Sequence, residues 1–234
     1  MIVSITQPAY LPWLGYFHRI AAADAHVVLD HVQFEKNSFT NRNKIRTHDG
    51  WSWLTVPVKT AGMFGKLRIN EIEIANEKNW ALKHWETMRL SYAKAEFFSE
   101  HAHFFESVYQ CSWQKLIDLT GEINTYLLQA FGIKTKLYFS SQMKAVGRKD
   151  ELVFNLCREL GATVYLSGPL GRNYLRERLF GDAGITVRYD DYRHPVYSQA
   201  YPGFEPYMAA VDLLLNVGPR SLKMILKDQE PHIQ

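Results

Sequence analysis

The chain has 234 residues, of which 47% are hydrophobic and 22% charged, and this composition argues against an intrinsically disordered protein. A net charge of +3 and the lack of any run of lysine and arginine argue against binding of nucleic acid through charge alone. Two cysteines without a CxxC pair, Cys111 and Cys157, indicate small buried side chains in a reducing compartment, not a zinc site or a redox pair.

The first predicted elements are a strand, a stiff loop and a helix. Residues 2–5 form an apolar strand, a loop with two prolines follows, and an apolar stripe at helical spacing begins at Trp13. Because ligands of α/β sheets bind beyond the carboxyl ends of the strands, we expect this loop to contribute binding residues. The candidates are Gln7, Tyr10, Trp13 and Tyr16, although aromatic residues at this spacing fit a packed core equally well.

A second strand is predicted at His26–Leu29, and it ends at Asp30. The order strand, helix, strand implies a parallel pair with a right-handed crossover, so Asp30 lies near the place where the first loop emerges. A carboxylate at this position can bind a ribose hydroxyl, a metal or a substrate amine. Its alternative role is to cap the turn that follows.

Residues 33–58 alternate between apolar and polar around His48-Asp49-Gly50, which predicts a β-hairpin. Its first arm carries Arg42 between Asn41 and Asn43. The planar guanidinium of Arg42 suits a phosphate or carboxylate, and the two amides can add donors to the same anion. A solvated arginine is the alternative. A further strand is predicted at Leu67–Ile74.

Apolar stripes from Asn76 to Phe131 predict a helical stretch that stops at Gly132. Strands at Lys136–Phe139, Thr163–Leu166 and Ile185–Tyr189, with a helix at Asp150–Leu160, then restore the α/β alternation. We therefore predict one domain over residues 1–234. It is a Rossmann-like, mostly parallel sheet flanked by helices, with a β-hairpin and a helical insertion at about residues 76–132.

The second candidate loop, Ser167 to Arg172, follows the predicted strand at Thr163–Leu166 and precedes a predicted helix at Tyr174–Phe180. Ser167, Gly168 and Arg172 at the start of a helix can cradle an anion. A Gly-x-x-Gly turn is common, however, and this one is neither a Walker motif nor a dinucleotide fingerprint.

The segment 190–207 is long, aromatic and without periodicity, which is typical of functional loops. His194 is its candidate for proton transfer near neutral pH, and bracing of the loop is the alternative role. A last helix is predicted at Glu205–Val217, where Asp212 and Asn216 share one face. These two side chains either position a ligand or brace the adjoining loops.

Together these motifs resemble the WbqC-like family over nearly the whole chain. The resemblance is carried by Gln7-Pro8-x-Tyr10-Leu11-Pro12-Trp13-x-Gly15-Tyr16-Phe17, Asp30-x-x-Gln33, Asn41-Arg42-Asn43, Trp53-Leu54-x-Val56-Pro57, Tyr165-Leu166-Ser167-Gly168, Tyr197-Ser198-Gln199 and Asp212-Leu213-Leu214-x-Asn216. It implies a role in the biosynthesis of O-antigen, a part of lipopolysaccharide, or of another bacterial surface polysaccharide. The expected reaction is transfer of an acyl or aminoacyl group to the amino group of a nucleotide-linked sugar.

A looser similarity connects the first loop with nucleotidylyltransferases. Trp13-Leu14-Gly15-Tyr16 stands where those enzymes carry their His-x-Gly-His signature, with aromatic residues at both histidine positions. The alternatives to an acyltransferase are therefore a nucleotidyltransferase-like enzyme with a degenerate signature and a non-catalytic protein that binds sugar nucleotides. A missing histidine pair argues against nucleotidyl transfer even where the fold is shared.

In the acyltransferase hypothesis, His194 removes a proton from the attacking amine and Asp30 orients the sugar. A thioester of coenzyme A or of an acyl carrier protein supplies the acyl group, so no bound cofactor or metal is required. The remaining candidates form the substrate site: Gln7, Tyr10, Trp13, Tyr16, Asn41, Arg42, Asn43, Ser167, Gly168, Arg172, Tyr197, Gln199, Asp212 and Asn216.

The sequence also predicts the cellular location of the protein and its binding partners. No apolar stretch approaches the roughly 20 residues that cross a bilayer, and no signal-type segment is apparent, so we expect a cytoplasmic protein without membrane insertion. The expected partners are a nucleotide-linked sugar, an acyl carrier protein and a second copy in a homodimer, with no nucleic acid.

Overall fold

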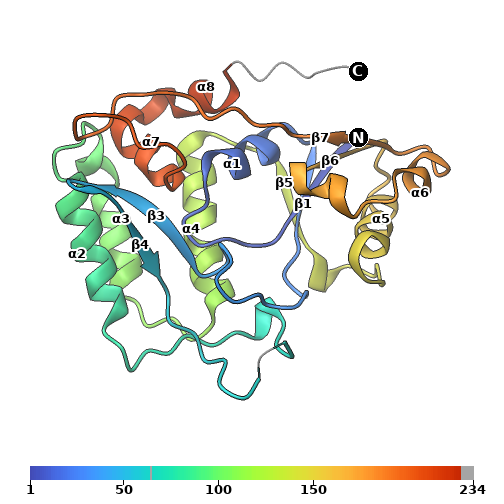
Figure 1. Cartoon of the computed structure of the whole chain (residues 1–234), viewed down its shortest axis with the longest axis horizontal. Coiled ribbons are helices and arrows are strands. Elements are labelled where there is room, and N and C mark those ends of the chain that lie inside the picture. Colours follow the sequence, from blue (N-terminus) through green and yellow to red (C-terminus); the bar gives the residue numbers. More distant parts are fainter. Residues whose placement is uncertain (64, 228–234) are drawn as a thin grey trace.

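A computed structural model describes residues 1–63 and 65–227 (Figure 1). Its centre is a five-stranded parallel sheet in the order β5-β2-β1-β6-β7. The strands are β1 (Ile2–Thr6), β2 (Ala25–Val28), β5 (Lys136–Phe139), β6 (Val164–Ser167) and β7 (Thr186–Tyr189). The predicted α/β fold with a parallel opening pair is thus confirmed, because Ser4 of β1 lies between His26 of β2 and Leu166 of β6.

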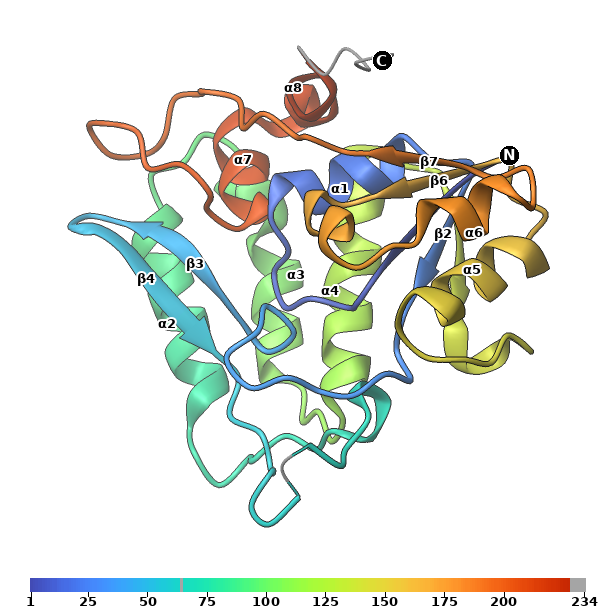
Figure 2. The same ribbon diagram turned by 45° about the vertical axis from the view of Figure 1, so that its right-hand side comes forward.

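Alternation along β1 assigns each face of the sheet to different helices (Figure 2). Val3 and Ile5 pack in an apolar cluster with α5 (Lys149–Glu159) and α6 (Glu177–Gly181). The intervening side chains point to the other face, where Ser4 and Thr6 bond the ring of the buried His26. That face is covered by α1 (Leu14–Ala21) and α4 (Leu116–Phe131).

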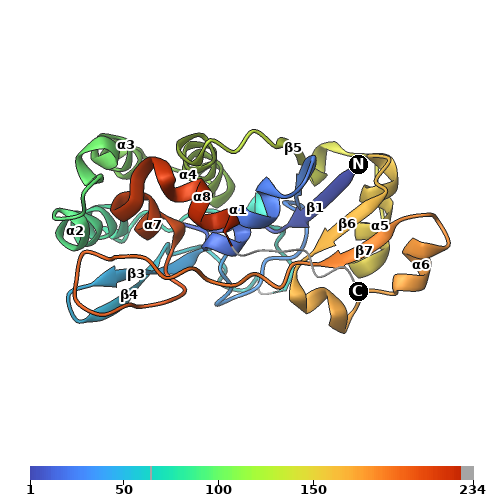
Figure 3. The same cartoon turned by 90° about the horizontal axis from the view of Figure 1, so that it is seen from above.

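The other half of the molecule consists of helices and the hairpin (Figure 3). The predicted helical stretch is confirmed as α2 (Trp80–Tyr92), α3 (Phe98–Gln110) and α4. The predicted hairpin is confirmed as β3 (Arg42–Thr47) and β4 (Gly50–Thr55), and it packs against α2 and α7 (Ala210–Val217). The chain continues through η4 (Gly218–Arg220) into α8 (Ser221–Leu226), which contacts α1.

Three elements differ from the predictions by more than one residue. Leu67–Ile74 forms no strand of a sheet but a 3-10 turn, η1 (Ile69–Glu71), because the Glu71 carboxylate accepts a hydrogen bond from the Arg68 amide and closes the turn. The helix predicted at Tyr174–Phe180 begins later, as α6, and the predicted loop before it contains the 3-10 turn η3 (Pro169–Asn173). The last long helix begins at Ala210 instead of Glu205, since Tyr207 has a positive φ of 62° that a helix does not accept.

The first loop joins the two halves of the molecule. The backbone amide of Tyr10 donates to the carbonyl of Phe39, and the side chain of Asn43 donates to the carbonyl of Leu11. The Ala210 amide donates to the carbonyl of Pro12. The polar backbone groups of this loop are therefore satisfied by the hairpin and by α7.

None of the helices in the described part of the chain is long and apolar enough to cross a membrane. The division into one domain with an inserted helical segment stays a prediction. Of the two cysteines predicted to be buried, Cys157 is buried, whereas the prediction is wrong for Cys111, which is exposed where α3 ends.

Candidate functional site

A pocket of about 500 Å³ lies between the hairpin, the loop before it and the start of α2. This volume is within the range of sites for small ligands and cofactors. We call it the basic pocket. Its lining residues are Phe34, Lys36, Asn37, Asn41, Arg42, Thr55, Val56, Pro57, Val58, Thr60, Lys78, Trp80, Lys83 and His84.

The charges of the basic pocket have one sign. Lys36, Arg42, Lys78 and Lys83 line it, and none of the described lining residues is an aspartate or glutamate. Cations that converge on a concave surface strengthen one another's field, because water is partly excluded between them. The pocket is therefore suited to an anion that carries more than one charge.

Arg42 and Asn41 hold unused hydrogen-bonding groups in the pocket wall. The guanidinium of Arg42 donates from Nη2 to the carbonyl of Asn37 over 2.8 Å and lies over the ring of Trp53, 4.5 Å from its centroid. Its Nε is buried and has no hydrogen-bond partner. Asn41, only 7% exposed, donates to the Val56 carbonyl, while its Oδ1 is buried without a partner. A buried donor and acceptor left without partners favour a ligand that supplies them.

His84 closes the pocket as a neutral imidazole. Burial lowers its pKa to about 4, so it carries no charge near pH 7. The Tyr10 hydroxyl lies 2.7 Å from its Nδ1 and also contacts the hydroxyl of Tyr109, and the Thr55 backbone forms a further hydrogen bond with the ring. With both ring nitrogens engaged, His84 positions the pocket wall and is not a free proton acceptor.

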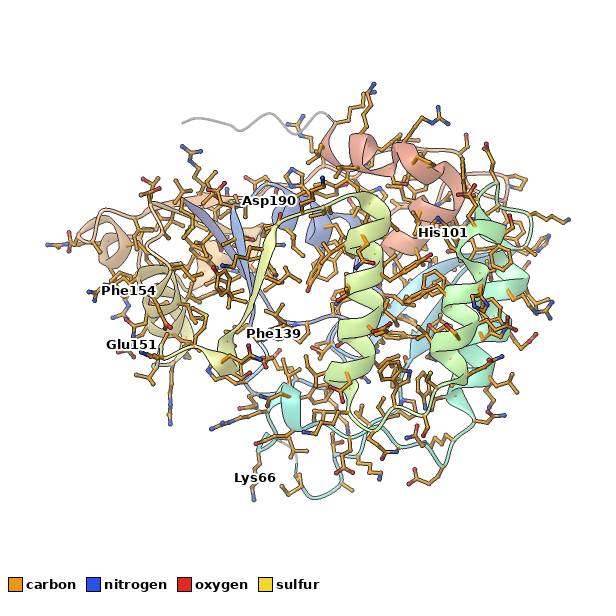
Figure 4. The ribbon with its side chains drawn as sticks, turned by 180° about the vertical axis from the view of Figure 1, so that it is seen from behind. Lys66, His101, Phe139, Glu151, Phe154 and Asp190 are labelled. Atoms are coloured by element: carbon orange, nitrogen blue, oxygen red, sulfur yellow. The ribbon has the colours of Figure 1, made fainter. Side chains whose placement is uncertain are left out.

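A second hollow lies between the sheet and α4, lined by Tyr16, Ile20 and His26 among others. It measures about 40 Å³, which is space for very few water-sized molecules and not for a sugar nucleotide. Phe139, at the end of β5, is another of its lining residues and is labelled in Figure 4.

The predicted catalytic residue Asp30 has a structural role in this conformation. Its buried carboxylate accepts hydrogen bonds from the hydroxyls of Ser140 and Ser141, over 2.9 and 2.6 Å, and from the Ser141 amide. These bonds hold the turn η2 (Ser140–Gln142) at the end of β5. Asp30 thus caps a turn far along the chain and not the turn that follows it, and its predicted catalytic role stays a prediction.

The loop after β6 is also engaged within the protein. Both terminal nitrogens of Arg172 donate to the carboxylate of Asp191, each over 2.7 Å, and its guanidinium lies 4.3 Å from the ring centroid of Tyr189. Ser167 donates to the Gly168 carbonyl. A Cβ on Gly168 would come within 2.5 Å of the Arg19 guanidinium, so this glycine makes room for a buried arginine. None of the loop's candidate residues lines the basic pocket.

His194, predicted as the base, lies in an aromatic cluster away from the residues that line the basic pocket. Its ring packs near those of Tyr197, Phe204 and Tyr207, and its Nδ1 lies 2.9 Å from the Pro195 carbonyl. Burial lowers its pKa, so the ring is neutral near pH 7. The structure places it where it braces the long loop.

Four further candidates tie that loop to α7. The buried carboxylate of Asp212 accepts hydrogen bonds from the hydroxyl of Tyr197 and the amide of Gln199, each over 2.8 Å. Asn216 donates to the backbone carbonyl of Asp212. Burial raises the pKa of Asp212. These hydrogen bonds correspond to the bracing alternative for Asp212 and Asn216.

The aromatic residues of the first loop are mostly core. Tyr10 and Tyr16 are almost completely buried, so their predicted stacking on a ligand does not fit this structure. Asn43 is buried as well. Trp13 is half-buried with its ring 5.1 Å from that of Phe39, and Gln7 is half-buried after β1. Of the predicted binding residues, the structure brings Asn41 and Arg42 to the basic pocket.

Sequence reasoning did not identify the three lysines, Trp80 or His84 as parts of a site. Lys36 comes from the loop before the hairpin and the other two lysines from the start of α2, and a surface lysine carries no periodic signal. The segment Trp53-Leu54-x-Val56-Pro57, noted in the family resemblance, borders the pocket and was the available indication.

Comparisons with known proteins agree with the resemblance. The model of the WbqC-like protein family matches residues 7–224. The chain is 38% identical over 223 residues to "Uncharacterized protein Rv1507c" of Mycobacterium tuberculosis (strain ATCC 25618 / H37Rv), and the match covers 92% of this chain and 94% of that protein. No solved structure matches the chain.

Proposed function

The chain belongs to the WbqC-like protein family, and we propose that it acts in the synthesis of bacterial surface polysaccharide by binding a nucleotide-linked sugar through its diphosphate. One observation carries this proposal: four cationic side chains and no described carboxylate line a pocket of about 500 Å³. A diphosphate brings at least two negative charges and several acceptor oxygens, which the cations of the basic pocket complement.

Arg42 is the principal anchor in this proposal. Its half-buried side chain stands at the start of β3 and lines the pocket. A phosphate oxygen can accept a charge-assisted hydrogen bond from its guanidinium, while the neighbouring lysines act as point charges. The unpartnered Oδ1 of Asn41 can accept a hydrogen bond from a hydroxyl or amide of the ligand.

The reaction proposed for the bound sugar is transfer of an acyl or aminoacyl group to its amino group. The amine nitrogen forms an amide bond with the thioester carbon, and the carbon–sulfur bond breaks. The leaving thiolate takes up the proton that the nitrogen loses. In this scheme the protein contributes by holding both reactants in place, which is a large part of the barrier reduction in acyl transfers.

A second candidate is a protein that binds sugar nucleotides without turnover. This candidate is favoured by the hydrogen bonds of His84, which is the one histidine among the described residues that line the pocket. Both of its ring nitrogens are already engaged within the protein. Among the described lining residues, the pocket then offers no free histidine as a general base.

The test has two stages. Calorimetric titration with nucleotide-linked amino sugars is expected to show binding that inorganic pyrophosphate displaces and that weakens as salt rises, because exposed charges are screened. Binding that neither pyrophosphate nor salt affects, or no binding, would overturn the proposed site. In the second stage, incubation with acyl thioesters is followed by thiol release and by the mass of the sugar nucleotide. Amide formation supports the transferase, whereas binding without any product supports the second candidate.

A further inference from the structure

The outward face of the hairpin carries a row of exposed aromatic rings. Strand pairing places Arg42 opposite Thr55 and Lys44 opposite Trp53, and residues two apart share a face of a strand. Trp51 and Trp53 therefore point outward with Arg42 and Lys44, whereas Leu54 points into the core.

Three rings in this row are open to water. Phe39 is 45% exposed, Trp51 46% and Trp53 38%. Their centroids follow one another at 6.3 Å from Phe39 to Trp53 and 6.2 Å from Trp53 to Trp51. We call Phe39, Trp51 and Trp53 the aromatic row. Large aromatic side chains gathered on a surface indicate a binding face, because their exposure to water is unfavourable.

Cations are interleaved with the rings. The Arg42 guanidinium lies 4.5 Å from the Trp53 ring centroid, and the Lys44 ammonium lies 4.7 Å from that of Trp51. A purely apolar partner would have to remove water from these charges at a cost. The face instead suits a planar ring that belongs to an anionic molecule.

The aromatic row lies next to the basic pocket. Arg42 lines the pocket and stacks on Trp53, and Thr55, which also lines the pocket, is two positions from Trp53 on the same face. A ligand anchored at Arg42 by its phosphates can therefore reach the rings with the part of the molecule that follows the phosphates.

From this continuity we propose that the aromatic row is the base-binding part of the site: the nucleobase of a nucleoside diphosphate stacks on it while the diphosphate occupies the basic pocket. The inference rests on the proposed function, and it assigns the base to residues that the sequence did not single out as binding residues. Stacking on aromatic side chains tolerates different bases, because every base has a π-face. The row thus supplies affinity for the nucleotide, and other contacts select the sugar.

The experiment compares two probes, uridine diphosphate and inorganic pyrophosphate, by calorimetric titration. Phe39→Ala is expected to raise the Kd of uridine diphosphate by about tenfold, within the range for loss of one stacked base, and to leave that of pyrophosphate within about twofold, because the Arg42 guanidinium lies over Trp53 and not over Phe39. Trp53→Ala is expected to weaken uridine diphosphate by a similar factor and pyrophosphate by a smaller one, since it also removes the ring beneath Arg42. Trp53→Phe restores a ring and is expected to recover most of the affinity. Tyr174→Ala, which removes a ring that is 48% exposed in the segment after β6, serves as control.

The outcomes separate this inference from the function on which it rests. If uridine diphosphate and pyrophosphate bind with equal affinity, or if Trp53→Ala weakens both alike, the base does not stack on the row, although the basic pocket still binds phosphate. If Trp53→Ala weakens a uridine diphosphate sugar but not uridine diphosphate, the row holds the sugar and the inference is wrong. If neither probe binds the unmodified protein, both proposals fail.

Discussion

The replacement Arg42→Gln tests whether the basic pocket binds an anion, and Lys44→Gln provides a matched control. Both cations stand on the outward face of β3, two residues apart, and each lies over a tryptophan ring. Arg42 lines the basic pocket and Lys44 does not. The two variants lose the same charge from neighbouring positions, so a difference between them reports on the pocket and not on net charge.

The magnitude follows from the guanidinium of Arg42. Its one described hydrogen bond runs from Nη2 to the Asn37 carbonyl, and the side chain lines the basic pocket, so a bound phosphate is expected to gain at least one charge-assisted hydrogen bond from it. Such a bond contributes about 1.5–3 kcal/mol. With about 2 kcal/mol for this half-buried site, Arg42→Gln is expected to raise the Kd for pyrophosphate roughly 30-fold.

Isothermal titration of pyrophosphate at low and physiological salt provides the measurement. For Lys44→Gln, less than a threefold change in Kd is expected, because a surface charge outside the pocket is screened. The melting temperatures of both variants are expected to remain close to that of the unmodified protein, since neither side chain belongs to the core. Equal losses of affinity in the two variants, or an unchanged Kd in Arg42→Gln, would refute the assignment of the anion site.

Three predictions concern stability, each measured by denaturant unfolding. Tyr10→Phe leaves Nδ1 of His84 without its 2.7 Å partner and is expected to lower the free energy of unfolding by about 1–3 kcal/mol; an unchanged value would show that the hydroxyl is not needed. Gly218→Ala puts a Cβ against the ring of Phe97 at a positive φ of 60° and is expected to cost about 1–3 kcal/mol, whereas Gly121→Ala, with nothing within 4 Å, is expected to be neutral or stabilising. Burial lowers the pKa of His84 to about 4 and of His26 to about 3, so as the pH falls these histidines become protonated in the unfolded chain before they do so in the folded protein. The free energy of unfolding is therefore expected to decrease as the pH falls below about 6.5, and an unchanged value from pH 7 to 5 contradicts this.

Much of the fold could be predicted from local sequence. The strand Lys136–Phe139 was predicted with its observed bounds, and the hairpin follows from the Asp49-Gly50 pair between two alternating runs. Periodicity and turn chemistry act over a few residues, so they can be read directly from the chain. The start of the last helix could not be predicted, because it depends on the backbone conformation of Tyr207.

The candidate site depended far more on tertiary structure. Asp30 has the appearance of a ligand-binding carboxylate at the end of a strand, and its partner Ser140 stands 110 positions along the chain. Nothing local distinguishes a carboxylate that binds a ligand from one that caps a distant turn. The same holds for Tyr10, whose hydroxyl reaches His84 and Tyr109 in two other helices.

The family and the α/β class follow from the sequence alone, which also predicted Arg42 as an anion-binding residue, because these inferences depend on motifs and on the chemistry of single residues. Which charges lie together depends on the tertiary fold. Lys36 belongs to the loop before the hairpin and Lys78 and Lys83 to the start of α2, and the fold brings them to one pocket with Arg42, the proposed binding surface for anions. Electrostatic attraction depends on distance in space and not on distance along the chain, so the tertiary fold creates the pocket's charge from residues that show no pattern in sequence.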